Sequence, residues 1–73
     1  MTIDYAAIQR EMPILKRRVT LARKKGPAAV MAASAAALAR FDVIGWPDDW
    51  AHFQRAYDGA AIELSFATRL GEL

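Results

Sequence analysis

The sequence predicts an all-α fold, arranged as a three-helix hairpin or bundle in a single domain over residues 1–73. Three segments carry apolar residues every three or four positions, which is the spacing of one helical face. The runs Gly26-Pro27 and Gly45-Trp46-Pro47 separate these segments. A glycine that ends one helix and a proline that begins the next are typical of such boundaries. No stretch alternates as a β-strand would, so helices are the only elements expected.

The first helix is expected over residues 4–24. Its apolar face consists of Ile8, Met12, Leu15, Val19 and Ala22. Pro13 interrupts this segment, because a proline removes one backbone donor and crowds the preceding turn. The helix therefore either kinks at Pro13 or begins near it. We favour the kink, because the apolar face keeps its phase across that position.

The second helix is expected over residues 27–41. Eight alanines lie between Ala28 and Ala39, and alanine is the strongest helix former. No charged residue appears before Arg40. A helix that is uncharged on all sides belongs in an interior. Two neighbouring helices of so short a chain can hardly cover it completely.

The third helix is expected over residues 47–70, with two stripes. The stripe expected to anchor the core is rich in aromatic rings, which bury large apolar areas, and consists of Trp50, Phe53, Tyr57, Ala61, Leu64 and Thr68. The stripe on the opposite side consists of Ile62, Phe66 and Leu70. This second stripe cannot face the same core. It either meets another chain or is capped by the N-terminal turn.

The small size of the chain favours an assembly. A domain of this length buries only about 60% of the surface that its unfolded chain exposes. Such domains usually need disulfides, a metal or a partner chain, and the absence of cysteine excludes disulfides and thiolate sites. We therefore expect a homodimer, a complex with another protein, or both, with a closed monomer as the alternative. The predicted contact residues are Val30, Met31, Leu38, Ile62, Phe66 and Leu70.

Charge is unevenly distributed along the chain. Residues 1–41 hold eight basic and two acidic residues, whereas residues 42–73 hold two basic and six acidic ones. The candidate contacts to nucleic acid are Lys16, Arg17, Arg18, Arg23, Lys24 and Lys25. The competing interpretation is a solvated surface, partly neutralised by the acidic half. The third helix opens with Asp48-Asp49, which repels phosphates, so any DNA contact should use the first helix with little sequence specificity.

No catalytic, cofactor or metal site is expected. Asp48, Asp49 and His52 can share one helical face, but carboxylates at a helix N-terminus are more simply explained as partners of the free N–H groups and the dipole. Ser34 and Ser65 suit helix contacts better than nucleophilic roles. The glycines are isolated and form no phosphate-binding loop. The sequence therefore predicts a protein that is not an enzyme and that takes no small-molecule substrate.

Residues 41–50, read as Phe-Asp-Val-Ile-Gly-Trp-Pro-Asp-Asp-Trp, are followed by Phe53-Gln54-Arg55-Ala56. This run resembles short uncharacterised helical proteins of actinobacteria and their phages, which carry a Gly-aromatic-Pro-Asp-Asp-Trp motif. No activity or site residue can be carried over from that group. The resemblance implies only a setting, which is a phage or prophage accessory gene whose product binds a host or phage protein.

Taken together, these patterns predict a cytoplasmic, non-enzymatic protein–protein interaction module. The alternative is a small basic nucleic-acid-binding protein that uses the first helix. The N-terminus lacks the pattern of a signal peptide. The uncharged run over residues 26–39 is shorter than the roughly 20 residues that cross a bilayer, so no membrane association is expected.

Overall fold

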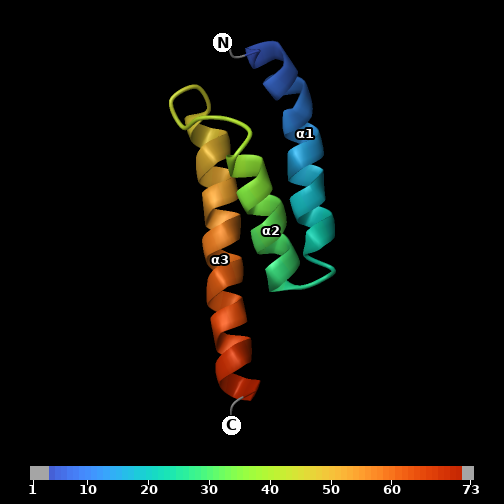
Figure 1. Ribbon diagram of the computed structural model, residues 1–73, viewed down its shortest axis with the longest axis vertical. Coiled ribbons are helices and arrows are strands. Elements are labelled where there is room, and N and C mark those ends of the chain that lie inside the picture. The colour runs from blue at the N-terminus through green and yellow to red at the C-terminus, as the bar shows by residue number, and fades with distance from the viewer. Residues whose placement is uncertain (1–3, 72–73) are drawn as a thin grey trace.

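A computed structural model describes residues 4–71 of the chain, apart from the side chain of Leu70. These residues form three helices, α1 (Tyr5–Ala22), α2 (Pro27–Leu38) and α3 (Pro47–Gly71), and no strand (Figure 1). The predicted all-α class is therefore confirmed. The molecule is elongated, with extents of 51 × 21 × 20 Å.

The shortest helix, α2, lies between the other two and packs against both (Figure 1). Direct links between α1 and α3 are fewer. One is an ion pair in which Lys16 Nζ lies 2.7 Å from Asp49 Oδ1. Because α2 is the common neighbour, its length determines how much of α1 and α3 is covered.

Each helix begins at a residue suited to that position. Asp4 caps α1, and its Oδ1 accepts a hydrogen bond from the Ala7 N–H at 3.0 Å. Gly26 precedes α2 with a φ of 116°, a left-handed conformation that glycine adopts without strain, and Pro27 then takes the first helical position. α3 begins with Pro47, and the first turn holds two carboxylates that complement the helix dipole.

The helix α2 ends at Leu38, three residues before the predicted end at Phe41. The chain turns there because the Phe41 ring is drawn into the core, where its centroid lies 5.7 Å from that of Phe53. The next turn is closed by Asp42, whose Oδ1 accepts a hydrogen bond from the Gly45 N–H at 2.6 Å. Burial of the aromatic ring therefore overrides the helical preference of the last residues.

The helix α1 continues through Pro13 rather than beginning there. Figure 1 shows its axis bending in the N-terminal half. The side chain of Pro13 is exposed, so the ring faces solvent rather than the neighbouring helix. This position lets the apolar face on the other side of α1 remain continuous.

The core lies where the three helices overlap. The predicted apolar face of α1 is buried throughout: Ile8, Met12, Leu15, Val19 and Ala22. The other two helices and the α2–α3 loop contribute Val30, Ala37, Phe41, Phe53 and Ala60. Phe53 is the largest side chain with no exposed surface, and the Trp50 ring meets Phe41 edge to face at 5.8 Å. An aromatic cluster between α3 and the α2–α3 loop therefore forms the part of the core next to this loop.

Candidate functional site

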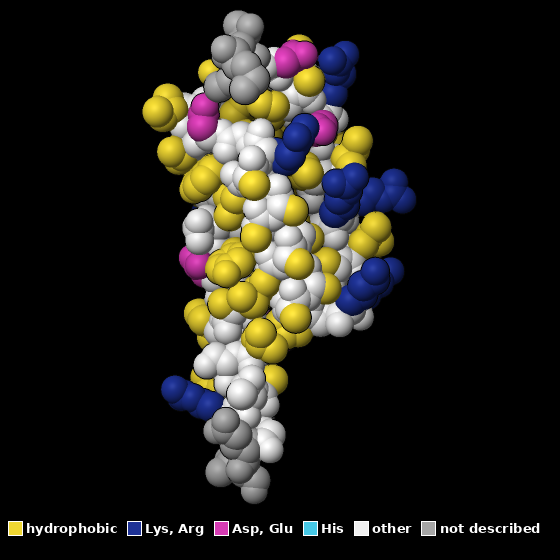
Figure 2. All heavy atoms as spheres, viewed as in Figure 1, with side chains coloured by type: hydrophobic (Ala, Val, Ile, Leu, Met, Phe, Trp, Pro, Cys, Tyr) yellow, Lys and Arg dark blue, Asp and Glu magenta, His cyan; other side chains and the backbone are white. Residues whose placement is uncertain are grey.

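Two uncovered apolar surfaces adjoin the core, and the first is the outer side of α2. Its inner side holds Val30, Ser34 and Ala37, all buried. The exposed positions on the opposite side, here called the alanine face, are Ala28, Ala32, Ala35, Ala36 and Ala39. Figure 2 shows hydrophobic side chains gathered over α2 and the adjoining part of α3. A face built only of methyl groups has low relief, which allows another helix to approach closely.

The second uncovered surface is the end of α3. From Ile62 to Arg69 every side chain is exposed, although the helix continues to Gly71. We call residues 62–71 the α3 extension. In Figure 1 it projects past the end of α2. Ile62 and Phe66 are 60% and 62% exposed.

The core stripe of α3 also continues into the α3 extension. Leu64 lies one turn beyond the buried Ala60 and continues the same side of the helix, yet it is 36% exposed. The predicted stripe is therefore covered only as far as Ala61, and its last members, Leu64 and Thr68, are open. The reason is geometric, because α2 has no residues alongside this part of α3.

A pocket of about 460 Å³ lies at the base of the α3 extension. Pro27 and Val30 of α2 form one wall, and Gly59 and Ala60 of α3 form the other. Arg23, Arg55 and Glu63 are also among the residues that line it. The two small residues on α3 leave room there for side chains that come from outside the chain.

The predicted contact residues divide into three groups. Ile62 and Phe66 are exposed, as a contact surface requires. Val30 is buried in the core of its own chain, and Met31 and Leu38 are half-buried and pack against that core. These three side chains therefore leave little surface for a partner. Leu70 lies outside the described side chains. On α2, the surface left for a partner is therefore the alanine face.

Sequence reasoning treated α2 as evenly apolar and did not find the alanine face. A usable signal was present, because the larger side chains of this helix, among them Val30 and Leu38, lie on one side. The alternative in which the N-terminal turn caps Ile62 and Phe66 does not apply. Tyr5 packs near Trp46, with ring centroids 6.4 Å apart, at the opposite end of α3.

The predicted basic cluster lies along α1 and the following turn. Lys16 is partly buried and pairs with Asp49. The other five predicted residues are exposed and have no ion-pair partner among the described residues: Arg17, Arg18, Arg23, Lys24 and Lys25. Most of the positive charge of α1 is therefore free to meet a partner.

Within residues 4–71 there is no cluster of His, Asp and Glu side chains that could hold a metal ion. Asp49 faces Lys16, and the His52 ring packs edge to face on Phe53 at 5.3 Å. Ser34 is fully buried and its Oγ has no hydrogen-bond partner, whereas Ser65 is exposed. None of these side chains forms a nucleophile–base pair among the described hydrogen bonds.

Comparison with known proteins adds no relative. No protein-family model, no curated protein and no solved structure matches the chain. The resemblance of residues 41–56 to small actinobacterial and phage proteins therefore stays a prediction. None of the three described helices combines the length and the apolar character that crossing a membrane requires.

Proposed function

We propose that this chain is a small, cytoplasmic, non-enzymatic protein-interaction module, and that its partner is a second copy of itself. The observation that carries the proposal is the α3 extension, where Ile62 and Phe66 are exposed on the side of the helix opposite its core stripe. Contiguous apolar patches of this kind on small proteins mark interaction sites. The phage or prophage setting rests on the Gly-Trp-Pro-Asp-Asp-Trp motif at residues 45–50 alone.

The area needed for a stable dimer favours using both uncovered surfaces. A standard interface buries about 800 Å² on each partner. The α3 extension is about 15 Å long at 1.5 Å per residue, which is short for an interface made by one helix. The alanine face of α2 adds a second strip about 18 Å long. A two-fold dimer presents the same surfaces from both copies, so each of the two strips contributes twice to the contact.

The chemistry of the two strips supports a protein partner. The alanine face contains no charged residue, and in the α3 extension only Glu63 and Arg69 are charged among the described side chains. A small groove of about 120 Å³ between Ile62, Phe66 and Arg69 offers a place for an apolar side chain. Burial of these surfaces gains free energy roughly in proportion to the apolar area covered.

The experiment is sedimentation or light scattering over a range of protein and salt concentrations. The unchanged chain is expected to form a species of twice 8.1 kDa that persists in high salt. Phe66→Asp and, separately, Ala32→Glu should shift it to the monomer, because each places a carboxylate in the contact. Ile14→Asp is the matched control, since it adds the same charge at an exposed aliphatic residue of α1. A monomeric unchanged chain, or a Phe66→Asp variant that still dimerises, would overturn the proposal.

A further inference from the structure

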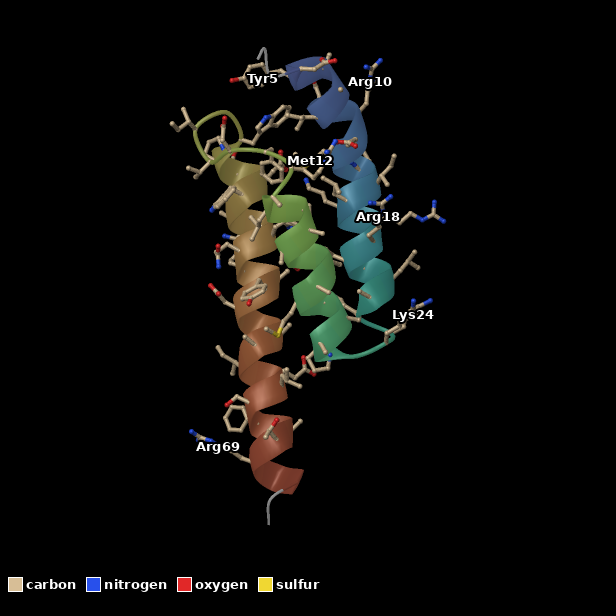
Figure 3. All side chains as sticks on the ribbon, in the orientation of Figure 1. Tyr5, Arg10, Met12, Arg18, Lys24 and Arg69 are labelled. Atoms are coloured by element: carbon tan, nitrogen blue, oxygen red, sulfur yellow. The ribbon has the colours of Figure 1, made fainter. Side chains whose placement is uncertain are left out.

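The outer side of α1 carries a row of cations that the protein-interaction surfaces do not use. Arg10 and Arg17 of α1, and Lys24 in the turn directly after it, are seven residues apart and exposed. Seven residues make almost two helical turns, so successive members lie on one side of α1 about 10 Å apart. Figure 3 shows Arg10, Arg18 and Lys24 projecting away from α2. The row is therefore open to solvent from α1 into the turn that follows it.

Carboxylates do not neutralise this row within the described residues. The two ion pairs there join Lys16 to Asp49 and Arg40 to Glu11, and both link α1 to a neighbouring part of the chain. Figure 2 shows Lys and Arg side chains along the α1 edge of the molecule. An anionic partner would thus meet this edge without competition from nearby acidic groups.

An apolar ridge follows the row of cations. Ile14 and Leu21 are 51% and 48% exposed and also lie seven residues apart. At 100° per residue, both lie between the row and Arg18, which is on the other flank. The outer side of α1 is therefore a ridge of two aliphatic side chains with basic side chains on both flanks.

We propose that the outer side of α1 binds duplex DNA by lying along the major groove. The groove is about 12 Å wide, which matches the diameter of a helix. In this arrangement Arg10, Arg17 and Lys24 contact the phosphates of one wall and Arg18 those of the other. Ile14 and Leu21 face the base edges, where thymine methyl groups offer apolar contact. Phosphate contacts dominate, so sequence preference is weak.

The observations favour DNA over the two other polyanions of comparable charge. The major groove of duplex RNA is too deep and narrow for side chains to enter. The apolar ridge of Ile14 and Leu21 could therefore not reach the base edges of RNA. An anionic lipid surface attracts the same cations, but helices that lie on membranes insert a broad apolar face rich in aromatic and leucine side chains. The outer side of α1 offers such a surface only two large aliphatic side chains, Ile14 and Leu21. The segment Arg10–Lys25 contains no aromatic residue.

Fluorescence anisotropy with a labelled DNA duplex of mixed sequence tests the proposal. Four phosphate contacts predict a slope of log K against log salt of about −3.6, or roughly 100-fold weaker binding at ~200 mM than at ~50 mM salt. The double variant Arg17→Ala/Lys24→Ala should bind more weakly and reduce the slope by about 2. Ile14→Ala/Leu21→Ala should weaken binding without changing the slope.

Arg55→Ala is the matched control for Arg17→Ala alone, because it removes the same charge from the exposed side of α3 outside the α3 extension. It should leave both affinity and slope unchanged, and equal loss in these two single variants would overturn the proposal by showing a net-charge effect. Absence of DNA binding at ~50 mM salt would also overturn it. So would binding to phosphatidylglycerol-containing vesicles that is stronger than binding to DNA.

This inference does not depend on self-association. The Phe66→Asp variant keeps α1 intact, so it should still bind DNA with the salt slope expected for each chain. If the protein is a dimer that binds no DNA, the DNA proposal alone fails. If the protein is a monomer that binds DNA, the self-association proposal alone fails. Circular dichroism of each variant verifies that the helices are retained.

Discussion

The two halves of α3 share one helix but differ in what surrounds them. Between Trp50 and Ala60 the inner side packs against α2 and the aromatic cluster, and Phe53 is fully buried. From Ile62 to Arg69 the side chains of the same helix are all exposed. The apolar pattern continues across this boundary, so the pattern by itself does not decide burial. The length of the neighbouring helix decides it.

The largest expected difference in the free energy of unfolding is between alanine variants of two phenylalanines. Phe53→Ala should reduce the free energy of unfolding by about 3–5 kcal/mol, because it empties a fully buried ring site. Phe66→Ala, its matched partner in the α3 extension, should change the stability of the monomer by less than about 0.5 kcal/mol. Urea denaturation at low protein concentration measures both. Equal losses would mean that the end of α3 is covered within the chain.

A smaller difference in the free energy of unfolding is expected between alanine variants of two serines, and here the substitution in the core is stabilising. Ser34 is fully buried and its hydroxyl has no partner, so Ser34→Ala should raise the free energy of unfolding by about 1 kcal/mol. Ser65→Ala in the α3 extension should have an effect within about 0.5 kcal/mol. Thermal unfolding of the two variants compares them. A less stable Ser34→Ala protein would show that the hydroxyl donates a hydrogen bond.

The smallest expected difference in stability is between two variants that each remove one positive charge. Lys16 bridges α1 to the covered part of α3, but its side chain is 43% exposed and therefore screened by solvent, so Lys16→Gln should cost only about 0.5 kcal/mol and less in high salt. Arg69→Gln in the α3 extension has no described carboxylate partner and should leave stability unchanged at every salt concentration. Chemical denaturation at low and high salt distinguishes the two. A salt-dependent effect of Arg69→Gln would contradict the comparison.

The sequence predicted α1 well because that helix is strongly amphipathic. Its five inward-facing residues follow one periodic pattern, and all five are buried. The start of α3 was equally clear, because Pro47 and the two following aspartates are specific to a helix N-terminus. In these places local chemistry and tertiary packing require the same residues, so the sequence is sufficient.

The candidate surfaces were harder to predict. In α2 nearly every residue is apolar, so polarity does not distinguish Val30, which faces inward, from Ala32, which faces outward, and only side-chain size separates them. The early end of α2 depends on Phe41 reaching Phe53 across the chain, which is a tertiary effect. Because α2 begins level with Gly59 and Ala60 of α3, the rest of α3 has no neighbour, and this uncovered end is seen only in three dimensions.

The uncovered end of α3 also affects how the helix melts. An isolated helix of about three turns is unstable in water because its first turn is costly to nucleate. Here the packed part of α3 supplies that nucleus, so residues beyond Ala60 only propagate an existing helix. Amide hydrogen exchange should then become faster gradually from Ile62 towards Gly71 rather than in one step. A second copy bound to this end would replace gradual fraying with cooperative unfolding, and association would thereby extend the folded unit itself.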